Sequence, residues 1–165
     1  MQPRFFIVMG VSGCGKSTVG KLLAQRLGQD FYDADDFHSP ANIAKMASGI
    51  PLNDDDRASW LDSLHDLIEN CLKENRPGVL ACSALKESYR QTLLAGNHGI
   101  QIIYLKGSYD QIFSRLSSRE AHFMSPELLL SQFNTLEEPA EAITVDVSLS
   151  TQAIVDVIIA ALSSP

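Results

Sequence analysis

The chain has 165 residues, of which 45% are hydrophobic, a length and composition that suit one domain with a sizeable core. The 20 acidic residues outnumber the 13 basic residues. The resulting net charge of −7 argues against broad binding to nucleic acid or to an anionic membrane. The three cysteines show no metal-binding spacing, no apolar run is long enough to span a membrane, and we expect no signal peptide before the first strand. We therefore expect a cytoplasmic protein with reduced thiols.

Hydrophobic patterning predicts strands that alternate with helices along the chain. The predicted strands cover residues 5–9, 31–32, 79–82, 100–105 and 143–147. The predicted helices cover residues 18–27, 58–73, 85–95, 109–118, 126–136 and 151–162, with Ser83 as a candidate N-cap for the third. Repeated strand–helix units form a parallel sheet covered by helices on both faces, so we expect an α/β three-layer sandwich. In such sheets, ligands bind beyond the carboxyl ends of the strands.

The first predicted strand runs into GVSGCGKS, residues 10–17, which matches the phosphate-binding loop pattern G-x-x-x-x-G-K-[ST] at every fixed position. Glycines let the backbone wrap closely around a polyphosphate, and the following helix adds positive potential at its N-terminus. We expect Lys16 to reach the β- and γ-phosphates of ATP and the Ser17 hydroxyl to bind Mg²⁺. The predicted phosphate-binding residues are Gly10, Val11, Ser12, Gly13, Cys14, Gly15, Lys16, Ser17 and Thr18.

Two carboxylates follow the second predicted strand. Asp33 and Asp35 are two residues apart, so both point the same way if this segment is extended. Phosphoryl transfer needs a neutralised triphosphate, an oriented hydroxyl and a group that accepts the hydroxyl proton. We assign Asp33 to the metal side and Asp35 to the acceptor hydroxyl, an order that follows only from their distance to the strand end. A solvated acidic turn is the alternative for either residue.

Cations near the predicted cleft suit an anionic, hydroxyl-rich acceptor. Arg57 follows three aspartates, residues 54–56, that favour a helix N-terminus. Arg57 either points into the cleft toward a substrate carboxylate or pairs with this aspartate run. Lys45, Lys86 and Arg90 are further candidates, although each alone fits a solvated surface charge.

A non-periodic stretch after the helix predicted at 109–118 has the features of a lid. Kinases exclude water by closing a lid over bound substrates, and we place this lid at approximately 119–126. Arg119 could reach the transferring phosphoryl group, and Arg115, one turn earlier, could stack on adenine. For either arginine, a charge at a helix end is the alternative.

Several segments together resemble the gluconokinase family, small P-loop kinases that phosphorylate D-gluconate on its 6-hydroxyl. Besides the phosphate-binding loop, the resemblance rests on YDADDFH (32–38), NIAKM (42–46), GIPLNDDDR (49–57), WL (60–61), CSALK (82–86), YR (89–90), HFM (122–124), SQF (131–133) and LE (136–137). It implies a fold like that of adenylate and shikimate kinases and an assembly that is often a homodimer. It also implies that Asp35 is the general base. By this resemblance, the residues around gluconate are Asp35, His38, Lys45, Arg57, Lys86, Arg90, His122 and Gln132.

We therefore expect one kinase domain over residues 1–165 that uses ATP and Mg²⁺ to make 6-phosphogluconate, with Lys16, Asp35 and Arg119 as catalytic residues. The expected partners are a small-molecule substrate and a second copy of the chain, with no nucleic acid and no membrane. One alternative is a kinase of the same fold that acts on another hydroxy acid such as shikimate. A nucleotide-dependent switch is less favoured because the chain lacks an N-K-x-D segment for reading guanine.

Overall fold

A computed structural model describes residues 3–118 and 125–164 of the chain. Its five strands form one parallel sheet in the order β2-β3-β1-β4-β5. The strands are β1 (Phe5–Met9), β2 (Asp30–Asp33), β3 (Gly78–Ala81), β4 (Ile100–Lys106) and β5 (Ile143–Asp146). Each lies where the sequence predicts it, within one residue at either end.

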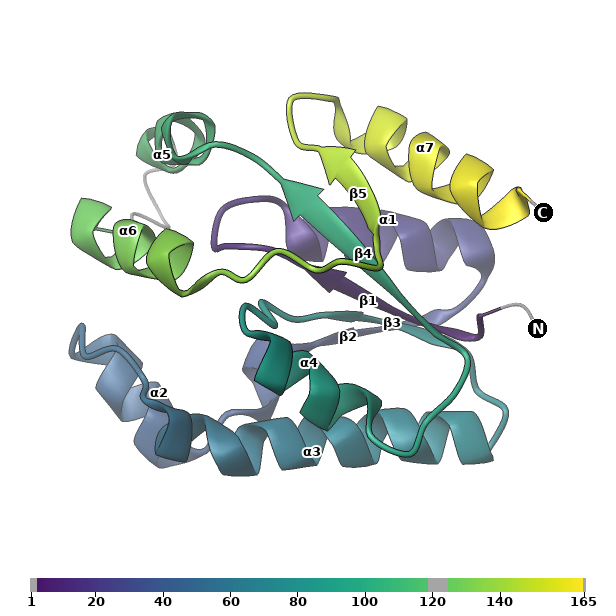
Figure 1. The fold of residues 1–165 in the computed structure, drawn as a ribbon, viewed down its shortest axis with the longest axis horizontal. Coiled ribbons are helices and arrows are strands. Elements are labelled where there is room, and N and C mark those ends of the chain that lie inside the picture. The colour runs from purple at the N-terminus through teal and green to yellow at the C-terminus, as the bar shows by residue number, and fades with distance from the viewer. Residues whose placement is uncertain (1–2, 119–124, 165) are drawn as a thin grey trace.

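Helices cover both faces of the sheet, which gives three layers (Figure 1). The helices are α1 (Lys16–Leu27), α2 (Pro40–Ala47), α3 (Asp54–Lys73), α4 (Glu87–Leu94), α5 (Tyr109–Ser117), α6 (Pro126–Thr135) and α7 (Thr151–Ser163), with a 3-10 helix, η1, at Ala34–Phe37. Helices α1 and α7 pack together on one face, whereas α3 and α4 cover the other (Figure 1). The predicted α/β sandwich is thus confirmed.

Strand β1 is the centre of the sheet, and all of its residues are buried. Its side chains alternate between two cores: Phe6 and Val8 pack with α1 and α7, whereas Phe5, Ile7 and Met9 pack with α3 and α4. β3 and β4 flank β1 on its two sides, so the order of the strands reverses there. In a parallel sheet, such a reversal opens a crevice at the carboxyl ends of the strands, which is where a ligand site is expected.

Helix α2 and the short η1 are absent from the sequence prediction. The Ser39 hydroxyl caps α2 by accepting a hydrogen bond from the Asn42 N–H at 3.2 Å, and Pro40 occupies the first turn. Both features are common helix-start signals and could have revealed the helix. Apolar periodicity could not, because Asn42 is the only residue that α2 buries.

Helix α3 begins four residues earlier than predicted, at Asp54. Asn53 and Asp56 form a capping box in which each side chain accepts a hydrogen bond from the backbone N–H of the other. The aspartates of the first turn also interact favourably with the helix dipole. Their predicted role at a helix N-terminus is therefore confirmed, and the capping box explains why the helix starts at these aspartates.

Ser83 does not cap α4, and that prediction is wrong. The helix begins at Glu87, whose backbone N–H donates a hydrogen bond to the Glu137 carboxylate at 2.8 Å. Ala84 has a φ of 45°, a left-handed conformation that cannot continue into a helix from Ser83. Ser83 instead lies in the loop after β3, at the carboxyl edge of the sheet.

Candidate functional site

An open cavity of about 650 Å³ lies at the carboxyl ends of β1, β2 and β3. Helices α2 and α6 stand on opposite sides of it (Figure 1). The predicted site residues that line it are Ser12, Gly13, Gly15, Lys16, Ser17, Thr18, Asp33, Asp35, His38, Arg57 and Gln132. A cavity of this size and position suits a small-molecule ligand.

The loop between β1 and α1 has the backbone geometry of a phosphate-binding loop. Gly10 has a φ of 151° and Gly15, the N-cap of α1, has a φ of 99°, values that other residues rarely adopt. A Cβ on Gly10 would lie 2.6 Å from the Cys14 Sγ, so only glycine fits there. Lys16 Nζ donates a hydrogen bond to the Val11 carbonyl at 3.1 Å and so lies over the loop. The loop thus offers an ammonium group and a helix N-terminus to an anion.

Three residues of this loop, Gly10, Val11 and Cys14, do not line the cavity. All three are buried, and Cys14 is 0% exposed. The side chains of Val11 and Cys14 pack into the core, so any contact of these three residues with a phosphate would come from their backbone N–H groups.

The Asp33 carboxylate connects the end of β2 to the phosphate-binding loop. Its Oδ2 accepts a hydrogen bond from the Ser17 hydroxyl at 2.9 Å, and its Oδ1 accepts one from the Asp35 backbone N–H at 3.0 Å. A hydroxyl and a carboxylate are the oxygen ligands that Mg²⁺ prefers beside a nucleotide, so this pair fits the predicted metal. The second hydrogen bond caps η1 and thereby fixes where Asp35 meets the cavity.

Asp35 lines the cavity among charged neighbours. Partial burial, which removes water from the carboxylate, raises the pKa of its carboxyl, and the charge of Asp33 raises it further, whereas Lys16 and His38 oppose the shift. The residue is nevertheless exposed to the solvent that fills the open cavity. A carboxylate with a raised pKa is a stronger base than an ordinary aspartate, and this one is open to a substrate.

His38 packs flat against Trp60, with ring centroids 4.4 Å apart and an angle of 14° between the planes. The Trp60 Nε1 donates a hydrogen bond to the Ala34 carbonyl at 2.7 Å, which fixes the indole. Burial lowers the pKa of His38 against the opposing effect of Asp35, so the imidazole favours its neutral form. Among the described residues, the buried Nδ1 of His38 has no hydrogen-bond partner.

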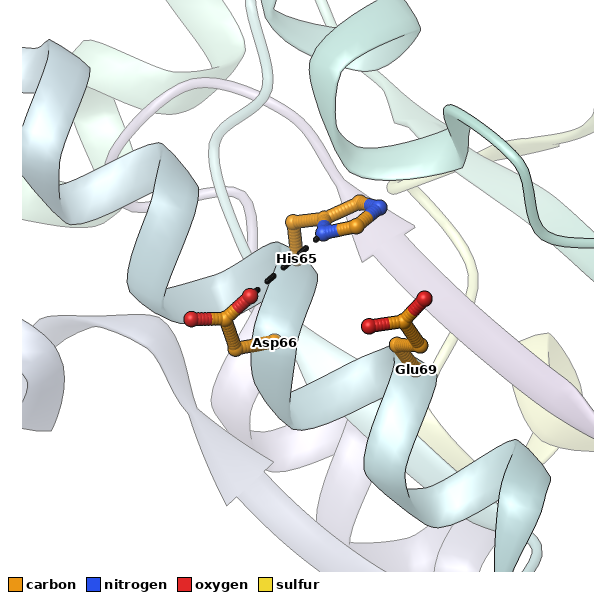
Figure 2. Close-up of side chains that lie close together, drawn as sticks. All are labelled: His65, Asp66 and Glu69. Atoms are coloured by element: carbon orange, nitrogen blue, oxygen red, sulfur yellow. Dashed lines mark ion pairs between the residues drawn. The ribbon is translucent and has the colours of Figure 1, made fainter.

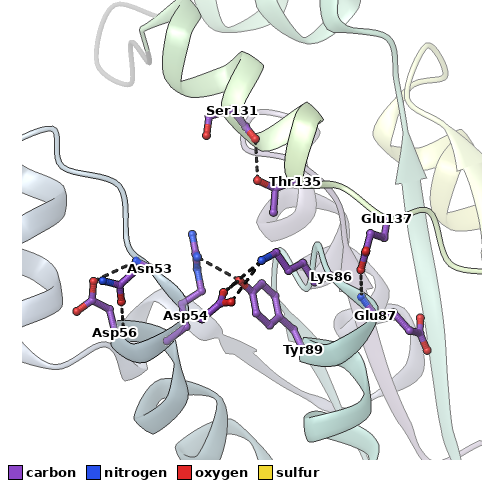
Figure 3. A network of polar contacts seen from close by, with 10 residues as sticks. Asn53, Asp54, Asp56, Lys86, Glu87, Tyr89, Ser131, Thr135 and Glu137 are labelled. Carbon is purple, nitrogen blue, oxygen red and sulfur yellow. Dashed lines mark hydrogen bonds and ion pairs between the residues drawn. The ribbon is translucent and has the colours of Figure 1, made fainter.

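Arg57 lines the cavity from the first turns of α3. Its Nη1 donates a hydrogen bond to the Tyr89 hydroxyl at 3.1 Å, and that hydroxyl donates one to Asp54 Oδ1 at 2.5 Å. Lys86 Nζ pairs with the same Asp54 carboxylate at 3.3 Å, so Asp54 sits between Tyr89 and Lys86 (Figure 3). Within residues 3–118 and 125–164, no ion pair joins Arg57 to a carboxylate, so the alternative of pairing with the aspartate run is not what the structure shows.

The structure does not bring Lys45 and Lys86 to the cavity lining. Lys45 Nζ pairs with the Asp56 carboxylate at 2.7 Å, and Lys86 pairs with Asp54. Both lysines are therefore already neutralised by aspartates of the first turn of α3. Their ammonium groups stabilise the rim of the cavity and are less available to an acceptor than Arg57.

Arg90 also lies outside the cavity lining, and its side chain is 2% exposed. Its guanidinium donates hydrogen bonds to the carbonyls of Ala84 at 2.7 Å, Leu85 at 3.2 Å and Glu137 at 2.7 Å. It also pairs with the Glu87 carboxylate at 2.9 Å. Arg90 thus holds the loop after β3, one wall of the cavity, in its left-handed turn at Ala84.

Gln132 joins α6 to the phosphate-binding loop. Its Oε1 accepts a hydrogen bond from the Ser12 N–H at 2.7 Å, and its Nε2 donates one to the Ser12 hydroxyl at 3.0 Å. Gln132 lines the cavity, but both ends of its amide already contact the loop. The pair of hydrogen bonds fixes α6 beside the position expected for the transferred phosphate.

A second hollow, of about 180 Å³, lies beside the phosphate-binding loop and α7. Arg115 forms one side of it, with Nη2 donating to the Val147 carbonyl at 2.7 Å and Nη1 to the Cys14 carbonyl at 3.4 Å. Leu149 and Ile154 supply apolar surface to the same hollow. A guanidinium held by two backbone carbonyls, next to apolar side chains, suits a planar aromatic ligand.

The predicted lid falls largely on residues that the structure does not describe. Arg119 and His122 lie outside the described residues. Ser125, at the end of the predicted lid, caps α6 by accepting a hydrogen bond from the Leu128 N–H at 3.2 Å, so the predicted start of that helix is confirmed. The roles of Arg119 and His122 stay predictions.

Several cavity-lining residues were not predicted as site residues, and those among them with a side-chain hydroxyl or indole N–H are Trp60, Ser83, Tyr89, Ser131 and Thr135. Ser83 and Tyr89 follow the carboxyl end of β3, so the rule that located Asp33 also points to them. Ser131 and Thr135 lie one turn apart on α6 (Figure 3). This helix borders the cavity although it is far from the phosphate-binding loop in sequence. Ser131 belongs to the SQF segment that carries the resemblance, whereas nothing in the local sequence distinguishes Thr135 from an ordinary helix-surface residue.

A separate cluster of ligating side chains lies on α3, outside the cavity: His65, Asp66 and Glu69 (Figure 2). His65 Nε2 contacts the Ala95 carbonyl at 2.7 Å, which makes it the protonated ring nitrogen. His65 Nδ1 lies 3.7 Å from the Asp66 carboxylate. These local contacts on the helix surface account for the cluster, and we do not include it in the candidate site.

Known proteins resemble this chain over most of its length. The chain is 49% identical over 155 residues to a probable gluconokinase of Mus musculus, with 84% of each protein covered. It is 44% identical over 154 residues to the thermoresistant gluconokinase of Escherichia coli (strain K12), covering 91% of this chain and 88% of that protein.

One solved structure gives the same family as these relatives, and a second structure and a family model give the wider fold. The crystal structure of a gluconokinase from Sinorhizobium meliloti 1021 matches with a TM-score of 0.89 and 41% identity, covering 98% of this chain and 92% of that chain. A shikimate kinase from Aquifex aeolicus VF5 shares the fold alone, with a TM-score of 0.59 and 18% identity over 96% of this chain and 95% of that chain. A family model described as shikimate kinase matches residues 12–163. The chain therefore belongs to the gluconokinase family, within the P-loop kinases that share the shikimate kinase fold.

Proposed function

We propose that this protein transfers the γ-phosphoryl group of ATP to the 6-hydroxyl of D-gluconate, which yields ADP and 6-phospho-D-gluconate. The observation that carries this proposal is a single cavity that contains a phosphate-binding loop, an aspartate with a raised pKa and a cavity-lining arginine. The first two suit phosphoryl transfer to a hydroxyl, and the arginine suits an acceptor with a carboxylate. The gluconokinases at 44% and 49% identity carry the same assignment of substrate.

In this mechanism Asp35 orients the acceptor hydroxyl and accepts its proton. The hydroxyl oxygen forms a bond to the γ-phosphorus as the bond from that phosphorus to the ADP oxygen breaks. Lys16 lies over the loop, where its ammonium would stabilise the negative charge that develops on the phosphoryl oxygens. Arg119, predicted to do the same from the lid, belongs to the same proposal.

Ser17 and Asp33 would hold Mg²⁺ beside the phosphates, because their oxygens already lie 2.9 Å apart next to the loop. A magnesium ion there supplies charge neutralisation of the triphosphate. The hollow beside Arg115 would take the adenine ring, since it adjoins the phosphate-binding loop through Gly15 and Thr18. This placement puts the adenine ring and the acceptor on opposite sides of the loop.

We also propose a homodimer, as the resemblance implies, and a location in the cytoplasm, as the cysteine usage predicts, with residues 1–165 as one kinase domain and a lid at approximately 119–126. None of the helices that the structure describes combines the length and apolar character that a bilayer crossing requires. Light scattering on the purified protein tests the homodimer. Fluorescence microscopy of the tagged chain in its own cells tests the location.

The proposal is tested by measuring ADP release with MgATP and a panel of acceptors: D-gluconate, shikimate, other aldonates, D-glucose and nucleoside monophosphates. We expect strong stimulation by D-gluconate alone. Stimulation by shikimate instead would favour the alternative acceptor, which has less support because the shikimate kinase from Aquifex aeolicus VF5 is only 18% identical to this chain. ATP binding without stimulation by any acceptor would contradict the proposed activity.

A further inference from the structure

Asp35, His38, Arg57, Trp60 and Tyr89 line the part of the cavity away from the phosphate-binding loop, which we call the acceptor half. Neither motif nor resemblance assigns a role to Tyr89 there. It lies on α4, lines the cavity and is 6% exposed. Two cations lie close to its ring, with Arg57 Cζ and Lys86 Nζ each 5.5 Å from the ring centroid. The aromatic face therefore attracts both groups.

The hydrogen bonds of the Tyr89 hydroxyl have a fixed direction. A tyrosine hydroxyl has one hydrogen, and here it is donated to Asp54 Oδ1 at 2.5 Å. The oxygen lone pairs are then free to accept, and one accepts from Arg57 Nη1 at 3.1 Å. Asp54 polarises the hydroxyl, which makes its oxygen a better acceptor for the Arg57 guanidinium.

The protonation states favour this direction at neutral pH. Burial raises the pKa of Tyr89, and its hydrogen bond to Asp54 raises it further. The hydrogen bonds from Tyr89 and Lys86 lower the pKa of Asp54. The tyrosine therefore keeps its proton while Asp54 stays ionised as the acceptor.

Arg57 is the cation in this cavity that is best placed for the carboxylate of an acceptor. Of the described side chains that line the cavity, the lysine and arginine are Lys16 and Arg57, and Lys16 lies over the phosphate-binding loop. Lys45 and Lys86 pair with aspartates outside the lining. The geometry of Arg57 therefore decides how an acidic acceptor is held, and Tyr89 is the side chain that fixes this geometry.

We infer that Tyr89 is a positioning residue that holds Arg57 for the carboxylate of the acceptor, with Asp54 orienting the Tyr89 hydroxyl. This inference rests on the proposed function, because it takes the acceptor to be a carboxylate such as gluconate. Tyr89 acts on acceptor affinity through Arg57 and takes no part in ATP binding or in the proton transfer to Asp35.

The experiment compares Tyr89→Phe with Tyr104→Phe. Tyr104 is a matched control because it is also buried, at 4% exposed, and also donates its hydroxyl hydrogen to a carboxylate, that of Glu138 at 3.1 Å, but it does not line the cavity. Loss of one hydrogen bond to a charged group predicts that Tyr89→Phe raises the KM for gluconate about tenfold. The kcat and the KM for MgATP should stay near their wild-type values in both variants. Tyr104→Phe should leave the KM for gluconate unchanged.

Asp54→Asn is the second variant, and it decides the matter if Tyr89→Phe does not fold. Asp54 is exposed and lies outside the capping box, so the helix start should survive its substitution. We expect a rise in the KM for gluconate in the same direction, without loss of ATP affinity. An unchanged KM in both Tyr89→Phe and Asp54→Asn, or an equal loss of kcat in Tyr89→Phe and Tyr104→Phe, would overturn the inference. Wild-type protein that neither binds gluconate in calorimetry nor phosphorylates it would overturn the proposed function as well.

Discussion

The two halves of the cavity are built in different ways. The nucleotide half is made mostly of backbone: a buried strand, a glycine-containing loop with positive φ angles and the first turn of α1. The acceptor half is lined by side chains of η1, α3 and α4, and ion pairs that join α2 and the start of α4 to α3 lie just outside this lining. Backbone geometry is encoded by residues close in sequence, whereas side-chain pairing depends on the packing of helices that are distant in sequence.

This difference explains why equal charges in the acceptor half have unequal roles. Lys45, Lys86 and Arg90 each have carboxylate or carbonyl partners outside the cavity lining, whereas Arg57 lines it and donates to a tyrosine. A cation that already has an ionic partner has less to offer a ligand. The following predictions test this division, from the largest expected effect to the smallest.

Asp35→Asn should have the largest effect, because it removes the proton acceptor but preserves the size of the side chain. Loss of a general base predicts a fall in kcat on the order of 10²- to 10⁴-fold, with ATP affinity close to that of the wild type. Steady-state kinetics and nucleotide calorimetry measure the two quantities. Asp36→Asn is the control, since Asp36 is a neighbouring aspartate that does not line the cavity. Near-normal turnover in Asp35→Asn would contradict the assignment of the base.

The pH dependence of the wild type should follow from the raised pKa of Asp35. As the pH falls through that pKa, the base becomes protonated and kcat falls, so the acidic limb should lie above the range of an ordinary aspartate. The folded state also binds this proton more tightly than the unfolded state does, so the ionised group destabilises the fold at neutral pH. Asp35→Asn should therefore melt at a higher temperature than the wild type at neutral pH, and this gain should vanish below the pKa of the unfolded chain.

Arg57→Met should come next, because it removes the guanidinium that we place against the acceptor carboxylate. Truncation of a charged, bidentate partner predicts a rise in the KM for gluconate of about 100-fold. The KM for MgATP should change little, since Arg57 lies in the acceptor half. A parallel rise in both KM values would indicate that the two halves of the cavity are not separable.

Arg90→Met should reduce stability. Without the guanidinium, the carbonyls of Ala84, Leu85 and Glu137 lose their donor, so the free energy of unfolding should fall by about 2 kcal/mol. Urea denaturation measures this change. Arg26→Met is the control, because Arg26 forms an exposed ion pair with Asp156 and its loss should cost less than about 1 kcal/mol. An Arg90 variant with normal stability and a raised KM for gluconate would instead support direct contact with the substrate.

Lys45→Met and Lys86→Met should have the smallest effects. Both lysines are partly exposed and paired with aspartates, so each substitution should change the KM for gluconate by less than about fivefold, well below the effect of Arg57→Met. The same kinetic assay measures all three variants. A Lys45 or Lys86 variant as impaired as Arg57→Met would show that the lysine leaves its aspartate to bind the acceptor.

Sequence alone predicts the nucleotide half well. The segment at residues 10–17 and the buried run before it place the loop, and the strand-end rule places Asp33 beside it, because each inference needs only neighbouring residues. It does not predict which cation of the acceptor half faces the cavity. Lys86 and Asp54 are 32 residues apart, and their pairing depends on how α4 packs against α3. The burial of the Arg90 side chain likewise depends on the left-handed turn at Ala84, which no local sequence motif predicts.

The two edges of the sheet bear on how copies of this protein can associate. β2 and β5 form the edges, and each has only four residues. β2 begins and ends with an aspartate, Asp30 and Asp33, and β5 ends with Asp146. Short edge strands that end in charged residues resist pairing with the edge of another sheet, because a second copy would bring like charges together. Edge-to-edge aggregation is therefore disfavoured, and a dimer of this chain would form through its helical surfaces.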